Sequence, residues 1–147
     1  MNFTFTRVTE ENIDVFKQLH VAHNQLDTIE TVMECFEEAR ELALWQPYAI
    51  ACDGVYVGFT MYGAFTDPQR VWFDRFFIDE RYQGKGYGKA VISIILENIA
   101  QTYGCHELYL SVYPHNLPAI HLYQQKGFVF TGELDTKGEH VMVLALP

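Results

Sequence analysis

The stretch Gln-Gly-Lys-Gly-Tyr-Gly-Lys at residues 83–89 has the composition of an anion-binding loop, because glycines occupy alternate positions in it. Residues 71–78, which precede it, are rich in aromatic and β-branched side chains and are typical of a strand, whereas residues 90–96 are the start of a strongly apolar helix. Glycine permits positive φ angles and lets the backbone approach a ligand closely. The free N–H groups and the positive dipole end of a helix N-terminus then face the anion. This order predicts a phosphate site, although glycines alone are also compatible with a structural turn.

The loop does not match the two phosphate-binding motifs that are easiest to test. A P-loop requires a leading glycine and a hydroxyl residue after its Gly-Lys, but Gln83 and Ala90 occupy these positions. A dinucleotide fingerprint requires Gly-x-Gly-x-x-Gly, and the sixth position counted from Gly84 or from Gly86 is not glycine. A nucleoside triphosphatase and a dinucleotide-binding fold are therefore disfavoured.

Length and composition limit the classes of protein. The chain has 147 residues, 49% of them hydrophobic, which predicts a single globular domain over residues 1–147. No apolar run approaches the roughly 18 residues that span a membrane, and the N-terminus lacks the pattern of a signal peptide. We therefore expect a cytoplasmic protein with no membrane partner. The net charge of −9 argues against a nucleic-acid partner and suits a cationic one. The alternative is that the acidic charge only keeps the protein soluble.

Cysteine and histidine give no sign of a metal site. The three cysteines are far apart and form no Cys-x-x-Cys pair, which is typical of reduced thiols. His20 and His23 are spaced to share a helix face, but no third ligand is placed near them. No metal is expected.

The hydrophobic pattern predicts a mixed α/β (α+β) fold in the order β-α-α-β-β-β-α-β-α-β-β. An Asp53-Gly54 pair indicates a type I′ hairpin turn, and Gly104 is expected to end the long apolar helix. Asp27 and Glu30 resemble a capping box at the start of the second helix, and Pro47 is expected to end that element. The expected strands are 3–8, 48–52, 55–62, 71–78, 106–113, 128–131 and 140–146, and the expected helices are 9–22, 27–46, 90–103 and 117–126, with a turn at 66–69.

The spacing Gln83-x-x-Gly86-x-Gly88 resembles the acetyl-CoA signature of the GNAT superfamily of N-acetyltransferases. The resemblance implies a central, mostly antiparallel twisted sheet flanked by helices, and acetyl-CoA as co-substrate. In that family the loop wraps the pyrophosphate, and the end of the preceding strand offers main-chain groups to the pantetheine arm. The residues that the resemblance assigns to the cofactor are Phe77, Ile78, Gln83, Gly84, Lys85, Gly86, Tyr87, Gly88, Lys89, Asn116 and Tyr123.

A second stretch, from Asn116 to Phe128, resembles the family element Asn-x-x-Ala-x-x-x-Tyr-x-x-x-Gly-Phe. Asn116 and Tyr123 are seven residues apart and so share a helix face. The resemblance implies that Asn116 contacts the pantetheine arm and that Tyr123 is the general acid for the leaving thiolate. The alternative is that Tyr123 is a core aromatic residue whose hydroxyl reaches the surface.

Acetyl transfer to an amine also needs a group that accepts the amine proton, since an alkylamine with a pKa of about 10.4 is protonated at neutral pH. Strict alternation would place Asp74 on the same strand face as Trp72, Phe76 and Ile78, where burial raises a carboxyl pKa. The resemblance implies that Asp74 binds the amine or removes its proton. A structural ion pair with Arg75 or with a lysine is the alternative.

Acidic residues recur at helical spacing between residues 30 and 41. Because this stripe contains few basic residues, we expect part of it to border the amine site, with Glu34 or Glu37 as substrate contacts; an outward, solvated face is the alternative. Almost the whole chain resembles bacterial spermine/spermidine N-acetyltransferases, which implies a polyamine substrate and a homodimer; the matching stretches are residues 23–26, 71–89, 116–128, 132–135, 138–139 and 141–143. Acetylation of another amine, such as an antibiotic or a protein N-terminus, and a CoA-binding sensor without turnover remain alternatives.

Overall fold

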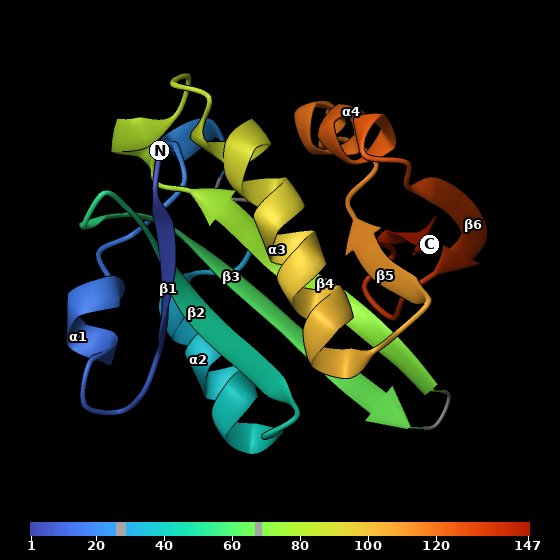
Figure 1. The fold of residues 1–147 in the computed structure, drawn as a ribbon, viewed down its shortest axis with the longest axis horizontal. Helices are drawn as coiled ribbons and strands as arrows, with labels where there is room; N and C mark the ends of the chain where they lie inside the picture. The colour runs from blue at the N-terminus through green and yellow to red at the C-terminus, as the bar shows by residue number, and fades with distance from the viewer. Residues whose placement is uncertain (26–28, 67–68) are drawn as a thin grey trace.

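A seven-stranded sheet forms the centre of the part of the chain that this computed structural model describes, residues 1–25, 29–66 and 69–147 (Figure 1). Its order is β1-β2-β3-β4-β5-β7-β6, and all neighbours are antiparallel except β4 and β5, which run parallel. The mixed, mostly antiparallel sheet expected from the sequence is therefore confirmed. The strands are β1 (Phe3–Arg7), β2 (Trp45–Cys52), β3 (Val55–Thr66), β4 (Gln69–Ile78), β5 (Glu107–Val112), β6 (Val129–Leu134) and β7 (His140–Ala145).

Helices cover both faces of this sheet (Figure 1). The long helix α3 (Tyr87–Tyr103) crosses one face, whereas α1 (Ile13–Phe16) and α2 (Val32–Glu41) lie on the other. Helix α4 (Leu117–Gln125) follows β5, and two 3₁₀ turns span His23–Gln25 and Glu80–Tyr82. In the described part of the chain, none of the helices is both long and apolar enough to cross a membrane.

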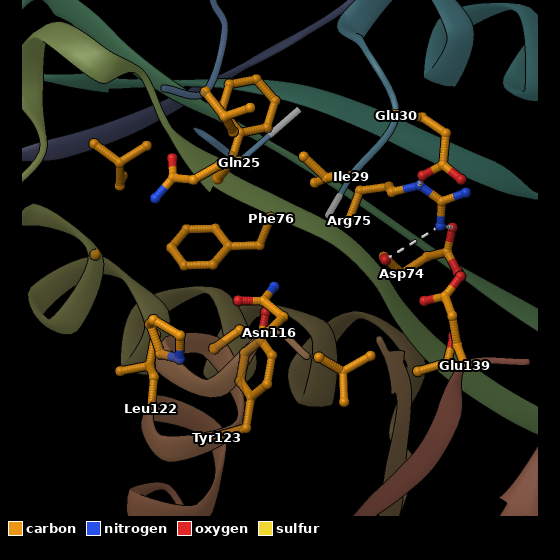
Figure 2. A pocket seen from close by; sticks show the side chains of 18 of the residues that line it. Gln25, Ile29, Glu30, Asp74, Arg75, Phe76, Asn116, Leu122, Tyr123 and Glu139 are labelled. Carbon is orange, nitrogen blue, oxygen red and sulfur yellow. Dashed lines mark hydrogen bonds and ion pairs between the residues drawn. The ribbon is translucent and has the colours of Figure 1, made fainter. Parts of the chain in front are cut away.

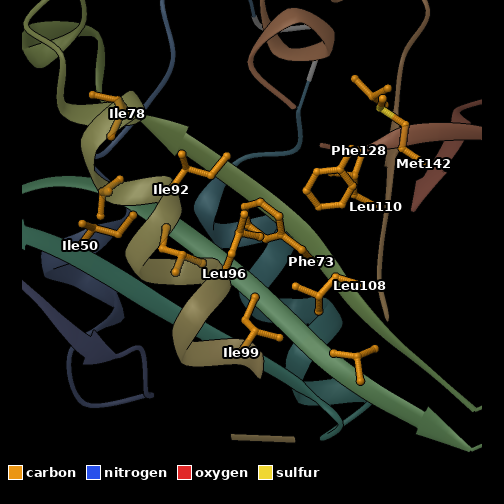
Figure 3. Close-up of a cluster of buried hydrophobic side chains, with 14 of the residues drawn as sticks. Ile50, Phe73, Ile78, Ile92, Leu96, Ile99, Leu108, Leu110, Phe128 and Met142 are labelled. Carbon is orange, nitrogen blue, oxygen red and sulfur yellow. The ribbon is translucent and has the colours of Figure 1, made fainter. Parts of the chain in front are cut away.

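The apolar stripe of α3 fixes the end of the helix that carries the glycine loop. Ile92, Leu96 and Ile99 lie one turn apart along the helix and are buried against Phe73 and Leu108 of the sheet (Figure 3). Gly86 is the N-cap of α3 and Gly104 its C-cap, both with left-handed φ angles, so the expected stop at Gly104 is confirmed. Because α3 packs directly on β4, the loop between them has a fixed position.

The first half of the chain departs from the expected boundaries. Thr31, not Asp27, is the N-cap of α2: its side chain accepts a hydrogen bond from the Glu34 N–H, and the Glu34 carboxylate accepts one from the Thr31 N–H. Asp27 lies outside the described residues, as does the centre of the expected turn at 66–69. Helix α2 ends at Glu41, and Pro47 lies inside β2 instead of ending the helix. Asp53 and Gly54 both have positive φ, as a type I′ turn requires.

A β-bulge interrupts β4 at Asp74. Met61 of β3 pairs with Arg75 and Tyr62 pairs with Phe73, so Asp74 is the extra residue on its strand. Phe73 and Phe76 therefore both pack in the cluster beneath α3, although they are three residues apart. The expectation that Asp74 shares a face with Phe76 was wrong, because strict alternation does not pass through a bulge.

Candidate active site

A cavity of about 250 Å³ lies where β4 and β5 separate. The two parallel strands are paired at Trp72 and Tyr109, and β4 then continues to Ile78 beside the start of α4. Such an opening at the ends of parallel strands is a common place for a ligand. The predicted site residues that line the cavity are Asp74, Phe77, Ile78, Gln83, Gly88, Asn116 and Tyr123.

The glycine loop reaches this cavity through Gln83 and Gly88. The Gln83 amide donates hydrogen bonds to the Ile78 carbonyl at 2.8 Å and to the Gln25 side-chain oxygen at 2.9 Å, so the side chain anchors the loop to the end of β4. Gly88 lines the cavity next to Ile78, and a Cβ atom added to Gly88 would lie 3.5 Å from the Ile78 side chain. Gly86 has φ +83°, which places the first N–H groups of α3 at the loop without a side-chain cap. Backbone donors at this helix end could hold a pyrophosphate.

Four other residues of the predicted loop lie outside the lining of the cavity. Lys85 and Lys89 are exposed, and Gly84 has a positive φ with open space around it. Tyr87 packs its ring edge-on against Phe3, with a centroid distance of 6.3 Å. These four residues are not among those that line the cavity, so any contact with a phosphate would be made at the surface.

Helix α4 contributes Asn116 and Tyr123 to the same wall of the cavity (Figure 2). Asn116 is at the N-cap position, but its side chain makes no capping hydrogen bond. The Tyr123 ring packs edge-on against Phe73 and Phe128, at centroid distances of 6.0 and 5.8 Å. Burial raises the pKa of Tyr123, so its hydroxyl remains protonated at neutral pH and can act as a proton donor.

Carboxylates gather around Arg75 at the opposite end of the cavity (Figure 2). The guanidinium contacts Asp74, and it lies 2.7 Å from Glu30 and 3.2 Å from Glu38. Burial raises the pKa of Asp74 to about 6, although Arg75 acts to lower it. Asp74 is therefore mostly ionised at pH 7 and can accept a proton. The ion pair with Arg75 that the sequence left open is also present.

Glu34 and Glu37 do not lie at this cavity. Glu34 forms the capping box of α2, and Glu37 is an exposed partner of Arg40 at 3.7 Å. The buried face of α2 carries Val32, Cys35 and Phe36, which directs those two glutamates outward. From the same acidic stripe, Glu30 lines the cavity because it precedes the helix and is not on its exposed face.

Sequence reasoning missed two residues of the site, Arg75 and Glu139. Arg75 was considered only as an ion-pair partner of Asp74, although the bulge directs both side chains to the carboxylate cluster. Glu139 lies just before β7 and lines the cavity with only 8% of its surface exposed. In the sequence it is an acidic residue directly before an apolar strand, within a stretch that resembles the family, and neither signal indicates a role in the site.

The chain belongs to the GNAT family of acetyltransferases, since the family model described as "Acetyltransferase (GNAT) family" matches residues 10–128. It is 45% identical over 152 residues to the spermine/spermidine N(1)-acetyltransferase of Bacillus subtilis strain 168, a match that covers 99% of this chain and 100% of the relative. The fold is similar to the spermidine N-acetyltransferase of Vibrio cholerae solved with CoA and spermine, with a TM-score of 0.74, 19% identity and coverage of 97% and 95%. It also resembles an aminoglycoside acetyltransferase solved with coenzyme A, with a TM-score of 0.80, 18% identity and coverage of 98% and 95%.

Proposed function

We propose that this GNAT acetyltransferase transfers the acetyl group of acetyl-CoA to a primary amine of a polyamine such as spermidine or spermine. The observation that carries the proposal is the polarity of the cavity. One end meets the glycine loop and the N-terminus of α3, which suit a phosphate, and the other end meets Asp74, Glu30 and Glu139, which suit an ammonium group. The full-length similarity to a spermine/spermidine acetyltransferase supports the choice of amine.

In the proposed reaction, the amine nitrogen attacks the thioester carbon, a C–N bond forms and the C–S bond breaks. The bound ammonium group must lose one proton before its nitrogen attacks and a second as the amide forms, and the leaving thiolate must gain one, so one proton passes to solvent in each turnover. Asp74 accepts the first of these protons, which its ionised carboxylate can do at pH 7. Tyr123 donates a proton to the sulfur, in keeping with a hydroxyl that burial keeps protonated.

The phosphate end of acetyl-CoA is assigned to residues 83–89 and its pantetheine arm to the space along Phe77, Ile78 and Asn116. Backbone N–H groups of the loop and of the first turn of α3 would bind the pyrophosphate. Gly88 leaves room for the ligand, because a larger side chain would enter the cavity. No metal is needed for this chemistry.

We further propose that the protein works in the cytoplasm as a homodimer. Cys35, Cys52 and Cys105 are all free thiols, which suits a reducing compartment. The edge strand β6 exposes the apolar side chains of Val129 and Leu134, with 59% and 63% of their surfaces accessible, and a second copy could cover them. Sedimentation or light scattering of the purified protein measures this association directly.

A thiol-release assay with acetyl-CoA tests the proposed function. We expect release of free CoA with spermidine and spermine, and much slower release with a monoamine, with an aminoglycoside or without an acceptor. Faster turnover of the aminoglycoside would assign the protein to a different amine. Binding of acetyl-CoA with no thiol release from any amine would indicate a sensor.

A further inference from the structure

We propose that Glu139 is a second carboxylate of the amine subsite, opposite Asp74, and that its free oxygens bind the ammonium group of the acceptor. This inference rests on the proposed function. It assigns a role in amine binding to a residue of the β6–β7 turn that neither the loop motif nor the α4 motif contains.

The turn that carries Glu139 is held firmly. The Asp135 carboxylate accepts hydrogen bonds from the N–H groups of Lys137 at 2.9 Å and Glu139 at 2.8 Å. The Asp135 N–H donates to the Glu139 carbonyl at 2.9 Å, and the Gly138 N–H donates to the Asp135 carbonyl at 3.1 Å. Strand β7 then pairs along the whole of β5. The Glu139 side chain is therefore positioned by backbone that is bonded on both sides of it.

The Glu139 carboxylate has no partner among the described residues. The residue as a whole is only 8% exposed, and no hydrogen bond or ion pair to a described residue satisfies its oxygens, which face the cavity that it lines. A carboxylate in such a sheltered place favours a cationic or hydrogen-bonding partner. In Figure 2 its carboxyl group points toward Asp74 along the wall of the cavity.

The nearby cations are already paired with other carboxylates. Arg75 contacts Asp74 and lies 2.7 Å from Glu30, whereas the Lys137 ammonium lies 2.8 Å from Glu30. The charged and titratable groups around Glu139 are Asp135 and Lys137 of its own turn, Asp74 and Arg75 of β4, Glu30 before α2 and Tyr113 after β5.

A primary ammonium group supplies what this arrangement lacks. It has one positive charge and three N–H donors, so it can bond to Glu139 and to Asp74 at the same time. A neutral alcohol would supply neither the charge nor enough donors. Because Asp74 already shares Arg75, Glu139 is the carboxylate with oxygens available to hold the substrate nitrogen beside the thioester.

The test compares Glu139→Gln with the matched control Glu133→Gln in the full-length protein. Glu133 belongs to the same β6–β7 hairpin, but it is exposed and bonded to Arg70. We expect Glu139→Gln to raise KM for spermidine by 10-fold or more, with KM for acetyl-CoA unchanged, and Glu133→Gln to leave both constants unchanged. A purely structural role would move both constants or neither.

The pH dependence of KM gives a second readout. Burial, with Asp135 nearby, raises the pKa of Glu139 to about 7. The ionised fraction of Glu139, which is the form that attracts an ammonium group, then increases about tenfold between pH 6 and pH 8. We expect KM for spermidine to fall over this range in the wild type and to remain flatter in Glu139→Gln.

The outcomes separate this inference from the function on which it rests. If the wild type acetylates spermidine but Glu139→Gln has the same KM and pH profile, Glu139 is not part of the subsite and the proposed function stands. If calorimetry detects no polyamine binding to the wild type, both proposals are wrong. If Glu139→Gln does not fold, the wild-type protein alone still tests the inference: a KM for spermidine that does not change between pH 6 and pH 8 overturns it.

Discussion

Replacing Arg75 by Met should destabilise the protein far more than replacing Arg70 by Met, although both arginines lie on β4 and both bind carboxylates. The Arg75 side chain is 9% exposed and forms ion pairs with Asp74 and Glu30, whose side chains are 12% and 19% exposed. Met fills most of the space of the arginine stem, so the main effect is the loss of charge. Removing one partner of a buried ion pair costs about 3–5 kcal/mol, because the remaining charges stay buried and unpaired.

The matched variant removes an exposed ion pair. Arg70 donates to Glu133 at 2.8 and 3.0 Å, but the Glu133 side chain is 46% exposed, and such pairs contribute about 0–1 kcal/mol. Arg70 also lies 4.2 Å from the Tyr109 ring, an interaction of about 0.5–1 kcal/mol. For a chain of this size, 1 kcal/mol corresponds to roughly 2–4 °C in Tm. We therefore expect Arg75→Met to lower Tm by roughly 10 °C and Arg70→Met by a few degrees.

The loss of unfolding free energy caused by Arg75→Met should depend on pH. Arg75 acts to lower the pKa of Asp74 and of Glu30, so both pKa values rise when it is removed. When a carboxyl group has a higher pKa in the folded than in the unfolded protein, the free energy of unfolding falls as pH rises from the unfolded pKa to the folded pKa. Urea unfolding between pH 4 and pH 8 should therefore show a deficit that grows with pH. A deficit that is constant across this range would refute the electrostatic reasoning and indicate lost packing.

Three further changes test the remaining assignments. Tyr123→Phe should lower kcat about 10²-fold at unchanged acetyl-CoA affinity, and a wild-type rate in steady-state kinetics would remove its role as general acid. Gly88→Val should weaken acetyl-CoA binding in calorimetry by at least about 10-fold with little change in Tm, because Gly88 lines the cavity and the added carbons would lie beside Ile78 and Phe76, whereas Gln101→Val on the exposed side of α3, near its other end, should bind normally. Glu34→Ala should cost about 0.5–1 kcal/mol, because the Thr31 N–H loses its partner while the Thr31 side chain still caps residue 34, and it should not raise KM for spermidine; a raised KM would return Glu34 to the substrate site.

The order of the elements could be predicted from the sequence because each has a local signal. The hairpin turn at Asp53-Gly54, the glycine loop and Gly104 all mark boundaries that depend on backbone conformation, which glycine and its neighbours largely determine. The boundaries of α2 were less accessible. Two overlapping patterns, at Asp27 and at Thr31, both resemble a capping box, and packing of Val32 and Phe36 against the sheet decides between them.

The carboxylate end of the site could not be predicted from spacing. The bulge at Asp74 depends on its pairing with β3, a partner that no local pattern identifies. Glu139 is 65 residues from Asp74 and reaches the cavity only because β7 pairs with β5. By contrast, Asn116 and Tyr123 lie on one short helix, so their shared face followed from helical periodicity.

Among the described residues β4 and β5 pair only at Trp72 and Tyr109, which has a consequence for the lifetime of the protein. Beyond this point β4 and β5 are linked through the apolar cluster that α3 shares with both strands and through side chains around the cavity. A ligand that spans the gap and binds only the folded protein stabilises it in proportion to the logarithm of the ligand concentration. We therefore expect acetyl-CoA to slow amide hydrogen exchange in residues 76–78 and 110–112 and to protect β5–β7 from proteolysis. Through this junction, the supply of acetyl donor would set how long the enzyme survives as well as how fast it works.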